Sequence, residues 1–260
     1  MKKETEKQSP SNLFEGMVSI RAVLQAQGTA YNNRRILRIL YAQENIARRP
    51  REYRFLCTMG EKYRFPVVLC TRAEIDSRAL GTTHAGILAE CSQRDLPCFT
   101  APDRPDGFYM MLEGIEDPYN FGYALRSLYA AGVDGLIVPP RNWMTAAGVV
   151  CRASAGTSEL LPMYTVSSVE DSIAVFRNAG YLIAAADVQN AENVYHTTLK
   201  KPLYLIVGGE KRGISAATLG QVDTIVRLVY GRDCAIALSA ASAASILAFE
   251  VLRQNRDIHF

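Results

Sequence analysis

An asparagine and an arginine six residues apart lie in a stretch that could do chemistry, Asp-Pro-Tyr-Asn-Phe-Gly-Tyr-Ala-Leu-Arg at residues 117–126. The spacing predicts a helix that follows a strand. Asn120 is expected to be its N-cap, because short polar side chains accept hydrogen bonds from the first helical N–H groups. Arg126 in the second turn would point toward the crevice where such sheets bind ligands. A salt bridge, or an aliphatic stem that lies along apolar surface with its guanidinium in solvent, is the alternative for Arg126.

A glycine-rich turn, Gly-Gly-Glu-Lys-Arg-Gly at residues 208–213, directly follows the apolar run 202–208. It matches neither of the phosphate-binding patterns, GxxxxGK[ST] and GxGxxG. Glu210 would also repel a phosphate, so the turn favours a ligand that is neutral or cationic at this point, or one that approaches with polar hydroxyls. Taken alone, the stretch is also compatible with an ordinary β-turn.

A third stretch, residues 234–255, consists almost wholly of alanine and serine in its first half. Small residues let a backbone approach another backbone or a ligand closely. Normal amphipathic helix spacing returns from Ile246 onward. Close helix packing and a ligand site are both open interpretations of this stretch.

The elements that must position these residues form an α/β alternation. Apolar strand-like runs occur at 108–115, 135–139, 181–187, 202–208 and 224–230. Because continuous apolar strands are typical of parallel sheets covered on both faces, we expect a doubly wound, mostly parallel α/β domain over residues 108–260. Between two of these runs, Ser168 and Gly180 have the spacing of a helix N-cap and of the glycine that follows a helix.

The N-terminal part predicts a smaller α/β domain over residues 13–95, preceded by a disordered tail at 1–12. Helical spacing at 20–27 and 52–63 alternates with apolar runs at 34–42, 66–70 and 86–91. Residues 96–107, with three prolines and no apolar period, are expected to be a linker.

Basic residues are distributed unevenly, although the net charge is only +3. Seven arginines crowd a short region whose only acidic residues are Glu44 and Glu52; they are Arg34, Arg35, Arg38, Arg48, Arg49, Arg51 and Arg54. This cluster favours a surface that binds a polyanion. A solvated helix face is the alternative.

The six cysteines include no CxxC pair and have no histidines at metal-ligand spacing, which argues against a zinc site. No apolar run follows the charged N-terminus, and no run of eighteen apolar residues occurs, so neither a signal peptide nor a membrane span is expected. A reducing cytoplasm is the expected location.

Taken in order, the three stretches resemble the signature motifs of the SpoU/TrmH family of RNA 2′-O-ribose methyltransferases, of the knotted SPOUT class. The first motif is matched by Asn120, Gly122 and Arg126, and the second by Gly208, Glu210 and Gly213. The Arg-Ala-Ser-Ala-Gly stretch of the family is matched by residues 152–156. The N-terminal domain resembles the small RNA-binding domain of the family, with Ala85 where its members commonly have glutamine.

The third motif departs from the common pattern of a proline after the strand followed by Ser-Leu-Asn. Leu228 lies in the segment that follows the strand, Leu238 aligns with the leucine, Ser239 with the asparagine, and Ala237 replaces the serine. These differences affect the place that helps hold cofactor and ribose in the family.

The resemblance implies S-adenosylmethionine as methyl donor, a C-terminal trefoil knot, a homodimer, a ribosomal or transfer RNA substrate, and no metal. It implies catalytic roles for Asn120, Arg126, Glu210 and Ser239, and cofactor contacts at Gly208, Leu228 and Leu238. Contacts to RNA phosphates are expected for Arg34, Arg35, Arg38 and Arg152.

Two other functions stay open at this point. A catalytically degenerate RNA-binding protein would explain the altered third motif. A nucleotide-dependent dehydrogenase would suit the α/β pattern, but the chain lacks the glycine fingerprint and the ribose-binding acid expected after it.

Overall fold

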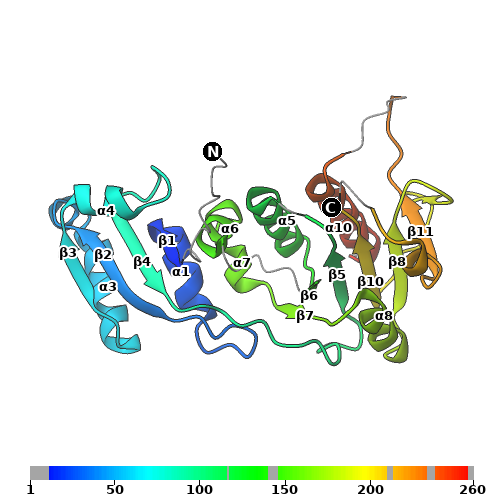
Figure 1. Ribbon diagram of the computed structural model, residues 1–260, viewed down its shortest axis with the longest axis horizontal. Helices are drawn as coiled ribbons and strands as arrows, with labels where there is room; N and C mark the ends of the chain where they lie inside the picture. Colours follow the sequence, from blue (N-terminus) through cyan, green and yellow to red (C-terminus); the bar gives the residue numbers. More distant parts are fainter. Residues whose placement is uncertain (1–11, 116, 140–145, 210–212, 233–237, 257–260) are drawn as a thin grey trace, which may run out of the picture. The chain divides into compact units, whose positions relative to one another are not determined.

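The computed structural model describes residues 12–115, 117–139, 146–209, 213–232 and 238–256. Contacts divide the chain into two compact units (Figure 1). The first unit runs to Asp95 and also includes the segment that ends at Leu160. The second unit begins at Leu96 and resumes at Leu161.

The first unit is built on a four-stranded sheet of order β1-β4-β2-β3. Its strands are β1 (Leu13–Glu15), β2 (Ile36–Ala42), β3 (Val67–Cys70) and β4 (Ile87–Cys91). Its helices are α1 (Gly16–Ala26), α2 (Asn45–Arg48), α3 (Pro50–Tyr63), α4 (Arg72–Arg78), α6 (Ala147–Ala153) and α7 (Thr157–Leu160). β4 pairs antiparallel with β1 and β2, whereas β3 pairs parallel with β2. The small α/β architecture expected for this part of the chain is therefore present.

Helices α6 and α7 pack in the first unit, although the sequence analysis assigned residues 108–260 to one domain. Ala147 and Cys151 of α6 join the same buried cluster as Phe14 and Ile20. Conversely, Phe99 of the expected linker packs in the core of the second unit. The order of residues along the chain did not reveal that α6 and α7 belong to the first unit or that Phe99 belongs to the second. Both assignments depend on contacts between residues far apart in the chain.

The second unit contains a seven-stranded sheet of order β7-β6-β5-β10-β8-β11-β9, in which every pairing is parallel. Its strands are β5 (Phe108–Leu112), β6 (Gly135–Val138), β7 (Met163–Thr165), β8 (Leu182–Ala186), β9 (Glu192–Asn193), β10 (Leu203–Val207) and β11 (Thr224–Arg227). Its helices are α5 (Pro118–Ala130), α8 (Val169–Asn178), α9 (Ala216–Leu219) and α10 (Ala240–Asn255).

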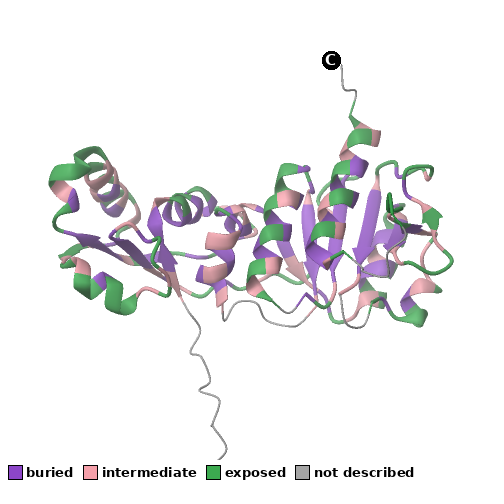
Figure 2. Cartoon of the chain, turned by 90° about the horizontal axis from the view of Figure 1, so that it is seen from above, coloured by how far each residue is buried: buried purple, intermediate pink, exposed green. Residues whose placement is uncertain are grey.

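Both faces of this sheet are covered, as the continuous apolar runs predict. Every residue of β5 and β10 is buried, and Figure 2 shows these strands buried beneath the helices. Met111 of β5 and Ile206 of β10 belong to the same buried cluster as Phe176 of α8. Helices α5 and α10 pack side by side (Figure 1). The expected trefoil knot stays a prediction, because segments 210–212 and 233–237 lie outside the described residues.

Both α8 and α5 begin at a side-chain N-cap, but the capping residue predicted from the sequence is right only at α8. The Ser168 hydroxyl accepts a hydrogen bond from the Asp171 N–H at 3.0 Å, and Gly180 has φ +78°, which confirms both predicted ends of α8. At α5 the predicted N-cap is wrong. Asp117 is the cap, and its carboxylate accepts a hydrogen bond from the Asn120 N–H at 2.8 Å. The Asn120 side chain is therefore not needed for capping.

None of the described helices is long and apolar enough to cross a membrane.

Candidate active site

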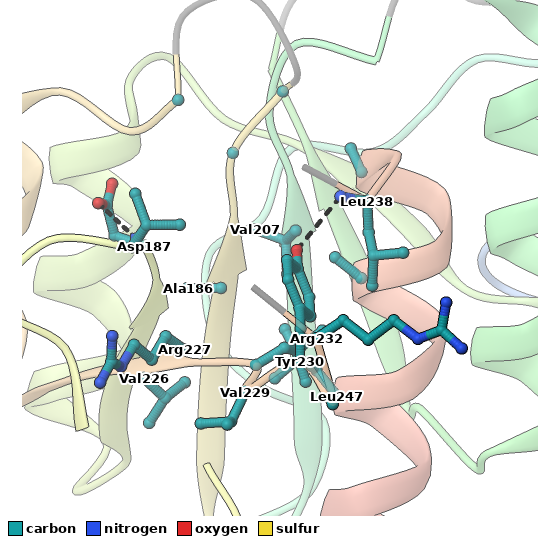
Figure 3. A pocket seen from close by; sticks show the side chains of 18 residues that line it. Ala186, Asp187, Val207, Val226, Arg227, Val229, Tyr230, Arg232, Leu238 and Leu247 are labelled. Carbon is teal, nitrogen blue, oxygen red and sulfur yellow. Dashed lines mark hydrogen bonds between the residues drawn. The ribbon is translucent and has the colours of Figure 1, made fainter. Parts of the chain in front are cut away.

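A pocket of about 680 Å³ lies in the second unit, where several parallel strands end (Figure 3). It is bordered by residues that follow β8, β10 and β11 and by the start of α10. The three residues that the sequence analysis assigned to cofactor binding, Gly208, Leu228 and Leu238, all line it. Its volume falls within the range of about 300–1,000 Å³ that is typical of small-molecule sites.

The wall after β10 is made of backbone, because glycines occupy it. A Cβ atom added to Gly208 would lie 2.6 Å from the carbonyl carbon of Gly213, and one added to Gly209 would lie 2.5 Å from the oxygen of Gly114. The Gly213 N–H donates a hydrogen bond to the Gly209 oxygen at 3.0 Å, which closes the turn. Gly213 itself has φ +60°. The turn thus brings bare backbone to the pocket; Glu210, a predicted catalytic residue, lies outside the described residues.

A hydrogen bond of Tyr230 connects the two segments of the altered third motif, the segment that follows β11 and the one that leads into α10. The Tyr230 hydroxyl accepts a hydrogen bond from the Leu238 N–H at 3.2 Å, as the dashed line in Figure 3 shows. Both residues line the pocket. Tyr230 was not among the site residues predicted from the sequence, although it is the aromatic residue that ends the apolar run 224–230.

Ser239, predicted to be catalytic, is the N-cap of α10. Its hydroxyl accepts a hydrogen bond from the Ser242 N–H at 3.1 Å and donates one to the Ser242 hydroxyl at 3.0 Å. These bonds already use the serine hydroxyl to hold the helix start. Ala237, the other altered position, lies outside the described residues.

Asn120 and Arg126 lie on α5 and do not line this pocket within the described part of the chain. Arg126 is exposed, in contrast to the buried residues Leu125 and Leu128 beside it. Among the described residues it forms no ion pair, so the salt bridge considered as its alternative role is not found there. The guanidinium of Arg126 is thus presented on the surface of the second unit.

Three of the four arginines expected to contact RNA are paired with carboxylates of the protein. Arg34 is only 2% exposed, and its Nε lies 3.0 Å from Glu159. Its predicted role in RNA binding is therefore corrected, because a buried guanidinium held by a carboxylate cannot reach a phosphate. Arg152 bonds to Glu15 at 2.7 Å.

Arg38 forms two hydrogen bonds to Glu90, at 2.6 and 2.8 Å. This pairing raises the pKa of Arg38 and, mainly through the same hydrogen bonds, lowers the pKa of Glu90. Arg35 alone among the four is exposed without an ion pair to another described residue. Other exposed arginines of the cluster lie on and beside α2 and α3, namely Arg48, Arg49, Arg51 and Arg54.

The segment of the chain that contains α5, the glycine turn and most of the pocket residues matches a known family profile. The profile of the SpoU rRNA methylase family matches residues 107–249, more than half of the chain. The chain belongs to this family. Membership confirms the predicted family, and the parallel seven-stranded sheet confirms the predicted α/β fold class.

Named relatives agree with this assignment. The chain is 29% identical over 197 residues to the 23S rRNA (guanosine-2′-O-)-methyltransferase RlmB of Shewanella oneidensis, an alignment that covers 73% of this chain and 79% of that protein. It is 31% identical over 150 residues to a putative TrmH family tRNA/rRNA methyltransferase of Staphylococcus aureus, covering 57% of this chain and 60% of the relative. The match to this second protein therefore spans less than two thirds of its length.

A solved structure shares the fold of this SpoU family member. It is an AdoMet-bound rRNA methyltransferase from Sinorhizobium meliloti, with a TM-score of 0.75 at 21% identity, and the match covers 93% of this chain and 86% of the other. At this identity the likeness establishes the fold alone.

Substituting Gly208 by alanine is expected to damage the pocket of this family member. The new Cβ would lie 2.6 Å from the backbone of Gly213, so the turn must move. We expect the affinity for S-adenosylmethionine to fall by at least about tenfold, measured by calorimetry. Gly231→Ala is the matched control, because Gly231 also lines the pocket but a Cβ there meets nothing within 4 Å. Equal affinities for the two variants would contradict the prediction.

Proposed function

We propose that the chain transfers the methyl group of S-adenosylmethionine to a ribose 2′-hydroxyl of ribosomal or transfer RNA. The observation that carries the proposal is the glycine-walled pocket at the carboxyl ends of β8, β10 and β11, lined by Gly208, Leu228 and Leu238 in a member of the SpoU family. The names of the relatives, a 23S rRNA guanosine-2′-O-methyltransferase and a tRNA/rRNA methyltransferase, support the enzyme class and the RNA substrate.

The residues of the pocket fit S-adenosylmethionine. The bare backbone of the glycine turn suits close approach by a nucleoside, and the cavity is large enough for it. When bound, the cofactor supplies an electrophilic methyl group on a positively charged sulfur. The backbone around Gly208, Leu228 and Leu238 would hold the adenosine.

Arg126 and Asn120 on α5 are proposed to act on the RNA. A guanidinium offers hydrogen-bond donors and no acceptor, so Arg126 is a poor general base. We assign it to clamping the neighbouring phosphate and to stabilising the negative charge that develops on the ribose oxygen as the hydroxyl proton passes to water or to that phosphate. Asn120 would orient the ribose, and Glu210 the turn that holds the cofactor.

The first unit is proposed to hold the RNA through its exposed arginines. Arg35, Arg48, Arg51 and Arg54 carry this role better than Arg34, because their side chains are exposed. Neutralising phosphates with such residues makes RNA affinity depend strongly on salt. The cytoplasm is the proposed location, and an RNA substrate is consistent with it. Thiols stay reduced there, which agrees with the five free cysteines among the described residues.

A homodimer is proposed to form through α5 and α10. Their surfaces expose several large apolar side chains, including Tyr123, Tyr129, Ile246 and Phe249. Exposed apolar patches of this kind mark interaction surfaces. A second copy of the chain would bury them and bring another α5, with its Asn120 and Arg126, near the pocket.

Phe249→Asp is expected to weaken this dimer at least tenfold, because it places a charge in an apolar contact. Sedimentation velocity over a range of protein concentrations measures the effect. Leu80→Asp is the control, since Leu80 is also exposed but lies in the first unit. A monomeric wild-type protein, or equal behaviour of the two variants, would contradict the proposed dimer face.

The proposed function is tested by methyl transfer from labelled S-adenosylmethionine to total RNA of a strain that lacks the gene. Mass spectrometry of the nucleosides should detect a 2′-O-methylated nucleoside that is absent when Arg126→Ala replaces the wild-type protein. A folded protein that binds RNA but neither binds the cofactor nor transfers methyl would instead be the catalytically degenerate RNA-binding protein.

A further inference from the structure

Asp187 occupies a place in the pocket that the sequence analysis did not assign. It directly follows β8, whose last residue, Ala186, pairs with Val207 of β10 on one side and with Val226 of β11 on the other. Asp187 therefore lies between the glycine turn after β10 and the segment after β11. It lines the 680 Å³ pocket, and Figure 3 places it across the pocket from Leu238.

The carboxylate of Asp187 is held by the backbone through one of its oxygens. Oδ1 accepts hydrogen bonds from the N–H groups of Val188 at 2.7 Å and Gln189 at 3.0 Å. The Asp187 N–H itself donates to the Val226 oxygen at 3.1 Å. Two bonds to one oxygen restrict the side-chain rotation, so the position of the other oxygen is also defined.

The second oxygen, Oδ2, is directed toward the glycine turn. It lies 4.0 Å from the point that a Cβ atom on Gly213 would occupy. Within the described residues Oδ2 accepts no hydrogen bond. The residue is half-buried, so this acceptor remains accessible from the pocket. A carboxylate oxygen can only accept hydrogen bonds, and it therefore selects a ligand group that donates one.

Nucleoside-binding α/β folds use such an arrangement. In the dinucleotide-binding fold, a glycine turn follows one parallel strand, and an acidic residue further along the chain accepts a hydrogen bond from the ribose. Here the glycine turn follows β10, and Asp187 follows the adjacent parallel strand β8. We infer that Asp187 Oδ2 accepts a hydrogen bond from a ribose hydroxyl of the adenosyl group. This inference rests on the proposed function, since it takes S-adenosylmethionine as the ligand.

Calorimetry with four ligands tests this role. S-adenosylhomocysteine carries both the ribose and the amino-acid part, whereas 5′-methylthioadenosine keeps the ribose and lacks the amino acid. Its 2′-deoxy and 3′-deoxy forms each lack one hydroxyl. Asp187→Asn puts an N–H donor or an uncharged acceptor in the place of Oδ2, and Asp187→Ala removes both oxygens. Gln189→Ala is the control, because its backbone N–H is unchanged and its side chain does not line the pocket.

We expect both Asp187 variants to bind S-adenosylhomocysteine and 5′-methylthioadenosine about tenfold or more weakly than the wild type, as for the loss of a hydrogen bond to a charged group. The wild type should bind one of the deoxy forms more weakly by a similar factor. In Asp187→Asn that discrimination should disappear. The Gln189→Ala control should match the wild type throughout.

Several results would overturn the inference. If Asp187→Asn and Asp187→Ala weakened only S-adenosylhomocysteine, the carboxylate would bind the amino group of the ligand and not the ribose. Equal affinity of the wild type for 5′-methylthioadenosine and both deoxy forms would also refute it, and this arm requires no variant to fold. A wild-type protein that binds none of the adenosyl ligands would overturn the proposed function as well.

Discussion

Arg126→Lys is expected to lower the rate of methyl transfer at least about 100-fold while leaving the affinity for S-adenosylmethionine unchanged. Removing one donor that stabilises charge in a transition state costs about 10²–10³ in rate. Lysine keeps the positive charge but not the planar fork that can hold a phosphate and the ribose oxygen together. Arg126 does not line the cofactor pocket within the described residues, so cofactor binding should not depend on it.

Single-turnover methyl transfer, with the cofactor affinity measured in parallel by calorimetry, separates these two effects. Ser127→Ala is the control on the same helix, because its hydroxyl bonds only to the Tyr123 backbone oxygen among the described residues. A lysine variant with nearly full turnover would show that charge alone suffices. A variant that also lost the cofactor would place Arg126 in binding rather than in catalysis.

Arg34→Ala is expected to destabilise the first unit by about 3–5 kcal/mol, as for other buried ion pairs that lose one partner. The side chains of Arg34 and Glu159 are 1% and 3% exposed, and their closest atoms are 3.0 Å apart. The same Glu159 oxygen accepts a hydrogen bond from the Asn32 amide at 3.0 Å, and Arg34 also donates to the Ser92 oxygen. Without Arg34, the Glu159 carboxylate would stay buried without this cationic partner.

Urea unfolding followed by circular dichroism measures this loss. The double variant Arg34→Met with Glu159→Leu should recover much of the stability, because it removes both buried charges. Arg35→Ala is the matched control, since its exposed side chain should affect RNA affinity and leave stability unchanged. If Arg34→Ala weakened RNA binding without any loss of stability, the original assignment of Arg34 to RNA would be right and the structural role wrong.

The amino-acid sequence by itself predicts the structural features that depend on residues close together in the chain. The apolar runs at 108–115 and 202–208 contain β5 and β10, because residues buried on both faces must be continuously apolar. The ends of α8 at Ser168 and Gly180 follow from local hydrogen bonding and backbone conformation. Family membership was also readable from the sequence, because its motifs have fixed spacing along the chain.

The tertiary structure alone decided which polar side chains are buried and which side chains meet. Arg34 and Arg35 are adjacent in a basic cluster, yet only Arg34 is buried, because α7 brings Glu159 to it from 125 residues away. In the sequence, Asp187 is the polar last residue of the strand-like run 181–187. It lines the pocket because β8 lies between β10 and β11 in the sheet. The hydrophobic pattern of the sequence predicts which residues of one helix or strand are buried. Sheet order and long-range packing determine which other residues they contact.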